Sequence, residues 1–165
     1  MEIHIQQLNN TYSDQLIDLI LTIQQKEFNI PITVEDQPDL KQIESFYIQA
    51  GGNFWGAFID GELVGSIALV KFDEKEAAIR KMFVKKEFRG KELNIAQKLL
   101  EILITFCREN KIDHLYLGTV SVLGAAMRFY ERNHFVQVEK ENLPDTFPLM
   151  SADNVFYKLK INEEI

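Results

Sequence analysis

The chain contains one cysteine, Cys107, among its 165 residues. A single thiol excludes an internal disulfide and is typical of proteins from a reducing compartment. The sequence begins Met1-Glu2-Ile3-His4 and lacks the basic stretch and apolar segment of a secretory signal peptide. No apolar run approaches the ~18 residues that a membrane span requires. These absences predict a cytoplasmic protein with no membrane partner.

Positive charge is also scarce, since 18 Lys and Arg stand against 25 Asp and Glu, for a formal net charge of -7. This balance argues against binding to nucleic acid, because such binding depends on neutralising phosphates. The histidines His4, His114 and His134 lack the spacing of metal ligands, so we expect no metal site. The sequence contains neither a Ser-His-Asp arrangement nor a P-loop, which argues against those two kinds of active site.

Hydrophobic residues make up 46% of the sequence, which is ample for one compact core. The chain shows no internal repeat, low-complexity tract or linker. Its length therefore predicts one domain over residues 1–165. Cys107 falls on the apolar stripe of an expected helix, where packing in the core is favoured over a role as nucleophile.

Hydrophobic periodicity predicts the order of helices and strands. Strands are expected over residues 2–8, 53–59, 63–72, 77–84, 114–120, 135–139 and 154–161. Helices are expected over 12–28, 38–49, 95–108 and 124–133, with Thr11 or Ser13 as the cap of the first. Asp60-Gly61 predicts a hairpin turn. The fold class is therefore α/β, a twisted mixed sheet of about seven strands flanked by about four helices.

A basic loop connects the strand that ends at Val84 to the helix that begins near Ile95. Unpaired N–H groups at a helix start attract anions, and the helix dipole adds to that attraction. Gly90 lets the backbone approach a ligand closely, and basic side chains add charge, from Lys85, Lys86, Arg89 and Lys91. A pyrophosphate is the natural occupant of such a loop. An ordinary solvated basic loop is the alternative when the segment is considered alone.

Two segments resemble motifs of the GNAT N-acetyltransferases. Arg89-Gly90-Lys91, followed by residues 95–100, resembles their acetyl-CoA pyrophosphate loop, and residues 125–135 resemble their second motif, which carries a Tyr near a helix end. The resemblance covers essentially the whole chain and is strongest to a bacterial branch of unassigned substrate. It extends through Asp36-Gln37-Pro38-Asp39-Leu40, Phe54-Trp55, Leu117-Gly118-Thr119, Leu143-Pro144, Phe147-Pro148, Asp153 and Phe156-Tyr157.

The resemblance implies the GNAT acyl-CoA N-acyltransferase fold, with acetyl-CoA as cosubstrate and no metal. It implies that an amine attacks the thioester directly and that a small-molecule primary amine receives the acetyl group. In that family a bulge splays the fourth strand from the fifth, and the pantetheine arm inserts there. The residues implied for acetyl-CoA binding are Met82, Phe83, Val84, Arg89, Gly90, Lys91, Asn94, Ile95, Ala96 and Gln97.

Tyr130 occupies the place of the family's general acid. A phenol with a pKa of ~10 can protonate a departing thiolate whose acid has a pKa of ~8.5. The alternative is that Tyr130 only packs in the core beside Phe129. The general base is unassigned, because Ala78 stands where a glutamate is usual; Glu76, Glu131, a water chain or a neutral amine would have to serve.

Two glycines of the family pattern are also replaced, by Asn94 in the loop and by His134 after the helix that carries Tyr130. We expect Asn133 to take the left-handed conformation that ends this helix. Two further alternatives stay open: a fold that holds acyl-CoA without catalysis, and acetylation of a protein amine. Residues 28–39 and 143–150 are expected to shape the acceptor pocket. The acceptor itself and the oligomeric state, monomer or homodimer, are not predicted.

Overall fold

The computed structural model describes residues 2–161, and a seven-stranded mixed sheet forms its centre. The strand order is β1-β2-β3-β4-β5-β7-β6, in which only β4 and β5 pair in parallel. The expected mixed sheet is confirmed. The strands are β1 (Ile3–Gln7), β2 (Asn53–Ile59), β3 (Glu62–Asp73), β4 (Glu76–Val84), β5 (His114–Thr119), β6 (Val136–Val138) and β7 (Val155–Lys160).

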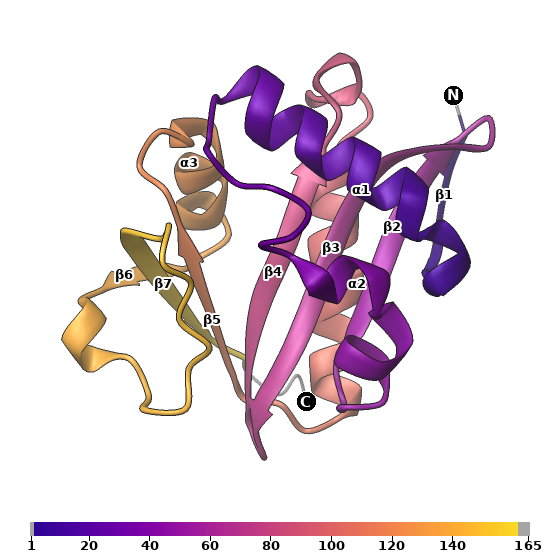
Figure 1. Ribbon diagram of the computed structural model, residues 1–165. Helices are drawn as coiled ribbons and strands as arrows, with labels where there is room; N and C mark the ends of the chain where they lie inside the picture. The colour runs from indigo at the N-terminus through magenta and orange to yellow at the C-terminus, as the bar shows by residue number, and fades with distance from the viewer. Residues whose placement is uncertain (1, 162–165) are drawn as a thin grey trace.

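Helices cover both faces of this sheet (Figure 1). α1 (Ser13–Leu21) crosses one face over β2, β3 and β4, and α2 (Ile95–Glu109) lies behind the same strands. α3 (Gly124–Arg132) follows β5. Each face has its own buried core, with Leu16, Ile20, Tyr47 and Phe54 on the α1 side and Ile67, Leu99, Leu103 and Tyr157 on the α2 side.

The first two expected helices are not regular α-helices over their whole predicted length. The helix predicted over residues 12–28 is α-helical only to Leu21 and continues as a π-helix over Thr22–Glu27. The helix predicted over residues 38–49 consists of a 3-10 turn, Pro38–Lys41, and a π-helix, Ile43–Ile48. The residue between them, Gln42, has φ -134 and ψ 45, so a continuous helix cannot pass through it.

The predicted cap of the first helix was wrong. The Asn9 side chain accepts a hydrogen bond from the N–H of Thr11 at 2.9 Å, and it caps the short turn Asn10–Tyr12 that precedes α1. Because the turn Asn10–Tyr12 precedes α1, the capping residue lies closer to the N-terminus than predicted. Neither Thr11 nor Ser13 is therefore in place to act as the cap.

The prediction for the end of α3 was also wrong, because His134 rather than Asn133 is left-handed. His134 has φ 72 and Asn133 has φ -96. The N–H of Phe135 donates to the Tyr130 carbonyl at 3.1 Å, and the N–H of His134 donates to the Glu131 carbonyl at 3.2 Å. This pair of bonds is the Schellman motif, which needs its left-handed residue at the position that His134 occupies.

A bulge and a splay in β4 determine where the functional cavities open. β4 pairs with β5 only from Glu76 to Ala78, whereas β5 continues along β7 as far as Thr119. Where β4 pairs with β3, two β4 residues, Lys81 and Met82, lie opposite a single β3 residue, which forms a β-bulge. Lys81 has φ 53 at this bulge. Such a bulge bends a strand and re-aims its side chains. Met82 and Phe83, in the part of β4 that has no partner in β5, line both of the cavities described below.

Candidate functional site

A cleft of about 580 Å³ opens between the end of β4, the start of α2 and the start of α3. Its volume lies within the range of about 300–1,000 Å³ that is usual for ligand sites. All ten residues predicted to bind acetyl-CoA line this one cleft: Met82, Phe83, Val84, Arg89, Gly90, Lys91, Asn94, Ile95, Ala96 and Gln97. Most of them are close in sequence, so one strand–loop–helix segment builds most of the wall.

The backbone at the start of α2 forms an anion-binding arrangement. The N–H groups of Ile95, Ala96 and Gln97 make no hydrogen bond within residues 2–161, as is usual for a first helical turn. Asn94 precedes them with φ 55, and Gly90 has φ 121. A Cβ atom at Gly90 would meet no neighbouring atom within 4 Å. Glycine is therefore favoured at this position because of the backbone conformation and not because of crowding.

Arg89 lines the cleft, but the protein already neutralises its charge. Its guanidinium forms a bidentate pair with Glu27, in which Nη2 lies 2.7 Å from Oε1, and its Nε donates to the Val84 carbonyl at 2.8 Å. Lys85 is similarly paired with Glu62 at 2.6 Å. The attraction for an anion therefore comes mainly from the backbone N–H groups and from two other cations that line the cleft, Lys91 and Arg132.

Tyr130 lies where two cavities meet, since it lines both the large cleft and a second, smaller pocket. Its side chain is 6% exposed, and its hydroxyl donates to the Sδ atom of Met82 at 3.6 Å, beside the β4 bulge. Burial, and secondarily the Asp153 carboxylate, raise the pKa of Tyr130 above its ordinary 10.0. The hydroxyl therefore keeps its proton at neutral pH, which is the state that an acid needs.

The second pocket, called here the acceptor pocket, has a volume of about 150 Å³. It adjoins the cleft, with which it shares Met82, Phe83 and Tyr130, and it lies between the segment after α1, the end of β5 and the loop before β7. The predicted segments contribute Ile30, Ile32, Phe147, Pro148 and Met150. Its ionisable residues other than Tyr130 are Arg80, Lys81 and Asp153, none of which sequence reasoning assigned to the site.

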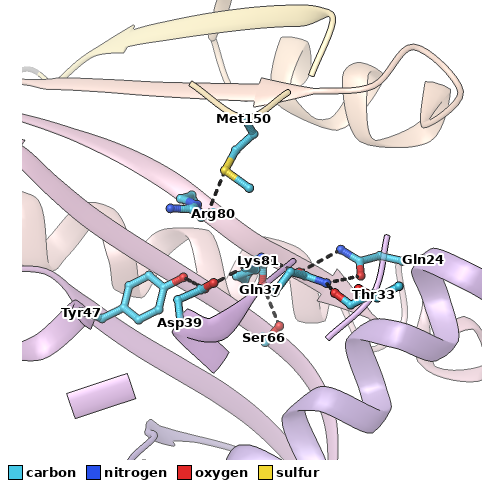
Figure 2. Close-up of polar contacts among 9 residues, drawn as sticks. All are labelled: Gln24, Thr33, Gln37, Asp39, Tyr47, Ser66, Arg80, Lys81 and Met150. Atoms are coloured by element: carbon cyan, nitrogen blue, oxygen red, sulfur yellow. Dashed lines mark hydrogen bonds and ion pairs between the residues drawn. The ribbon is translucent and has the colours of Figure 1, made fainter. Parts of the chain in front are cut away.

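A buried polar network holds Lys81 at the edge of this pocket (Figure 2). The Lys81 ammonium donates to Gln37 at 2.5 Å and lies 3.8 Å from the carboxylate of Asp39, which accepts a hydrogen bond from Tyr47 at 2.5 Å. Gln37 and Gln24 exchange hydrogen bonds through their amides. Burial lowers the pKa of Lys81 to about 8 even though Asp39 opposes the shift. The ammonium is therefore mostly charged at neutral pH.

The general-base candidates suggested by the sequence lie elsewhere. Glu131 accepts a hydrogen bond from the Tyr157 hydroxyl at 2.7 Å, and neither Glu131 nor Glu76 lines the acceptor pocket. Asp153 does line it, and burial raises the pKa of its carboxyl to about 6 against the opposing effect of Arg80 and Lys81. Asp153 comes from an irregular loop, so no local periodicity or motif spacing marked it as a base.

Three further observations concern Cys107, groups of metal-ligating side chains and the length of the helices. Cys107 is fully buried, and burial raises the pKa of its thiol to about 12, so its predicted packing role is confirmed. In the part of the chain that the structure describes, no three His, Cys, Asp or Glu side chains are grouped to hold a metal. Over the same residues no helix is long and apolar enough to cross a membrane.

Comparison with known proteins agrees with this architecture. The acetyltransferase (GNAT) family model matches residues 17–135. An N-acetylaspartate synthetase from Danio rerio is 33% identical over 139 residues, covering 76% of this chain and 48% of that protein. The chain thus spans about half the length of this relative.

Solved structures extend the comparison to the complete fold. The crystal structure of a GNAT-family acetyltransferase from Staphylococcus aureus Mu50 has a TM-score of 0.94 and 41% identity, covering 98% of this chain and 100% of that one. N-acetylglutamate synthase from Neisseria gonorrhoeae, in complex with coenzyme A and N-acetyl-glutamate, has a TM-score of 0.77 at 15% identity, covering 99% and 36%. The latter likeness concerns the fold alone. The family match over most of the sequence, on a sheet splayed between two cavities, shows that this chain belongs to the GNAT acetyltransferase family.

Proposed function

We propose that the protein transfers the acetyl group of acetyl-CoA to the primary amine of a small molecule in the cytoplasm. The observation that carries the proposal is the position of Tyr130 between the large cleft and the acceptor pocket. A thioester extending from the cleft and an amine in the pocket would meet beside its hydroxyl. This arrangement favours direct transfer over storage of the acetyl group on the protein, because Cys107 is buried in the core.

The cleft suits acetyl-CoA in both of its parts. Free N–H groups at the start of α2 would bind the pyrophosphate. The β4 edge beyond Ala78 has no partner in β5, so its backbone groups would pair with the amides of the pantetheine arm. The Neisseria enzyme of the same fold was solved with coenzyme A, which supports this assignment.

The size of the acceptor pocket favours a small molecule over a protein. An apolar cavity of about 150 Å³ holds a molecule of the size of benzene, and the acceptor pocket has a similar volume. The name of one relative supports the same inference, because the Danio rerio protein is an N-acetylaspartate synthetase. We therefore infer a compact amine as acceptor, although a peptide amine reaching in from outside is the competing candidate.

The chemistry follows from the surroundings of Tyr130. Attack by the amine nitrogen on the thioester carbon places negative charge on the carbonyl oxygen, and an unpaired N–H on the β4 edge would stabilise it. Collapse of the adduct breaks the carbon–sulfur bond, and Tyr130 would give its proton to the departing sulfur. Asn94 is left-handed, a conformation that glycine adopts most readily, and this supports acetyl-CoA binding at the loop. Tyr130 is the feature that favours catalysis over a binding module.

A coenzyme A release assay tests the proposal. Purified protein and acetyl-CoA are combined with amino acids, polyamines, aminoglycosides and peptides, and free thiol is measured. In parallel, acetyl-CoA at 100 times its Kd should add about 2.7 kcal/mol of stability in a thermal melt. Turnover of a small amine together with this shift is the expected result. If neither appears at millimolar acetyl-CoA, the proposed function is wrong.

A matched pair of glycine variants identifies the site. Gly90 and Gly61 both have positive φ, and neither has an atom within 4 Å of a built Cβ. Gly61 belongs to the hairpin turn between β2 and β3, far along the chain from the cleft. Gly90→Val should abolish the acetyl-CoA-dependent shift, whereas Gly61→Val carries a similar backbone strain and should retain it. Equal loss in both variants would count against the cleft as the binding site.

A further inference from the structure

Arg80 presents a cation to the acceptor pocket without a carboxylate partner. Its Nη2 donates to the Sδ atom of Met150 at 3.1 Å (Figure 2). Its guanidinium lies 5.8 Å from the centre of the Phe46 ring. Within residues 2–161 it forms no salt bridge. Sulfur and an aromatic ring satisfy a guanidinium poorly compared with a carboxylate, so the pocket retains an unmatched positive group.

Asp153 presents the opposite charge to the same pocket. Over the described residues its carboxylate makes no hydrogen bond and no ion pair, and Tyr130 and Gly118 line the pocket with it. A Cβ built on Gly118 would lie 2.4 Å from Asp153 Oδ2, so the carboxylate is packed directly against β5. Unpaired charges of both signs in one partly buried pocket are costly unless a ligand completes them.

The β4 bulge explains why Lys81, the other cation of the pocket, does not pair with Asp153 in place of a ligand. Successive strand residues normally point to opposite faces, yet Arg80 and Lys81 both contact segments on the α1 side, at Phe46 and Asp39. The positive φ of Lys81 produces this re-aiming. Asp39 is the ion-pair partner of Lys81. The pocket charges that lack an ion pair and remain for a ligand are one cation, Arg80, and one anion, Asp153, which attract each other only over a longer distance.

We propose that the acceptor is a small amino acid, whose carboxylate binds Arg80 and whose ammonium group binds Asp153. The proposal rests on the proposed acetyl transfer and specifies its substrate class. A zwitterion complements the two unmatched charges of the pocket, whereas a simple amine would leave Arg80 unpaired. Arginine is suited to this role because its planar guanidinium accepts a carboxylate through two parallel hydrogen bonds.

Asp153 would also take the first proton in the reaction. The ammonium gives one proton to the Asp153 carboxylate, and the freed lone pair forms the new carbon–nitrogen bond. The carbon–sulfur bond then breaks, the sulfur takes the Tyr130 proton, and the second proton of the nitrogen restores Tyr130. Asp153 returns its proton to water, so the products are an amide, the thiol of coenzyme A and one proton. A carboxyl whose pKa is about 6 is ionised at neutral pH and able to accept this proton.

Matched acceptors test the substrate class. Alanine, ethylamine and alaninamide share an amine, but only alanine carries a carboxylate. One charged hydrogen-bonded contact is worth about 1.5–3 kcal/mol, so kcat/KM should be roughly 10- to 150-fold higher for alanine than for the other two. Glycine, β-alanine and aspartate define how far the class extends. Equal rates with all three matched acceptors would overturn the inference and leave the proposed function standing.

The variant Arg80→Gln identifies the residue. It should remove the excess of kcat/KM for alanine over kcat/KM for ethylamine. The ratio of the two is the readout, because the Arg80 charge also acts on the pKa of Asp153, which serves both acceptors. Lys140→Gln removes an equal charge from an exposed position and should keep the preference. Asp153→Asn should reduce kcat by about 10²–10⁴ with either acceptor. Preference retained in Arg80→Gln would show that another group binds the carboxylate and that the assignment is wrong.

Calorimetry with coenzyme A-loaded protein separates binding from catalysis. Alanine should bind this complex more tightly than ethylamine, and Arg80→Gln should remove the difference. If alanine binds in this way but is never acetylated, the amino-acid site stands and the proposed function fails. If coenzyme A binds but neither alanine nor aspartate does, or if only peptide amines are acetylated, the substrate class proposed here is wrong.

Discussion

The ammonium of Lys81 lies 3.8 Å from the carboxylate of Asp39, and both side chains are only 6% exposed. Lys81 stands at the β4 bulge, while Asp39 comes from the 3-10 turn Pro38–Lys41 on the α1 face. The Ser66 hydroxyl also donates to the Lys81 carbonyl at 2.7 Å. A buried ion pair thus holds the segment whose bend separates β4 from β5 and opens both cavities.

Asp39→Ala should destabilise the protein by about 3–5 kcal/mol, because it leaves the Lys81 charge buried and uncompensated. Urea denaturation measures the change. Tyr47→Phe is the matched control, since it removes only the hydroxyl that donates to Asp39 and should cost about 1 kcal/mol. The double variant Asp39→Leu/Lys81→Met should recover much of the loss. A cost for Asp39→Ala no greater than that of Tyr47→Phe would contradict a structural role for the pair.

The free energy of unfolding should rise with pH through the titration of Lys81. Its pKa is about 8 in the folded protein and 10.5 ordinarily, so between these values the unfolded chain binds more protons. Stability then increases toward alkaline pH by about 1.4 kcal/mol per pH unit; below pH 8 both states are protonated and this dependence disappears. Urea denaturation at pH 7, 8, 9 and 10 should show this excess slope over Lys81→Met. Parallel curves for the two proteins would refute the lowered pKa.

Tyr130→Phe should lower kcat by roughly 10²–10⁴ and leave acetyl-CoA affinity almost unchanged, since it removes the proton but keeps the ring. Tyr157→Phe is the control. Its ring centre lies 5.9 Å from that of Tyr130, but its hydroxyl donates to Glu131 and not to Met82. A fully active Tyr130→Phe enzyme would show that Tyr130 acts only in packing and not as the acid. A loss of acetyl-CoA affinity instead would indicate a binding role.

Asn94→Gly should tighten acetyl-CoA binding, because Asn94 has φ 55 and its side chain makes no capping hydrogen bond. Glycine also lets the backbone N–H groups approach a pyrophosphate more closely, and a gain of about 1 kcal/mol in the complex corresponds to about a fivefold lower Kd. Asn94→Ala, which keeps a Cβ without the tolerance of asparagine, should cost roughly 1–2 kcal/mol of stability. Isothermal titration and thermal melts measure both. Weaker binding in Asn94→Gly would show that the amide itself contacts the ligand.

Local patterns in the sequence were sufficient for most of the fold. Alternation placed the strand Asn53–Ile59 at its observed bounds, and the apolar stripe of α2 placed its start at Ile95. Asp60 and Gly61 take φ 50 and 81, the two positive angles that the hairpin turn predicted there requires. The cleft was predictable for the same reason, since most of its wall comes from the contiguous segment between Met82 and Gln97.

Only the tertiary structure decided the acceptor pocket. Arg80, Asp153 and Gln24 come from a strand, a late loop and the end of the first helical segment, and no spacing in the sequence relates them. The bulge that turns Lys81 toward Asp39 depends on register with β3, and the left-handed residue after α3 depends on which carbonyls the turn must satisfy. The periodicity of hydrophobic residues in the sequence indicates which face of a helix or strand is apolar. The pairing of distant charges is determined by how those elements pack, so it appears only in the folded chain.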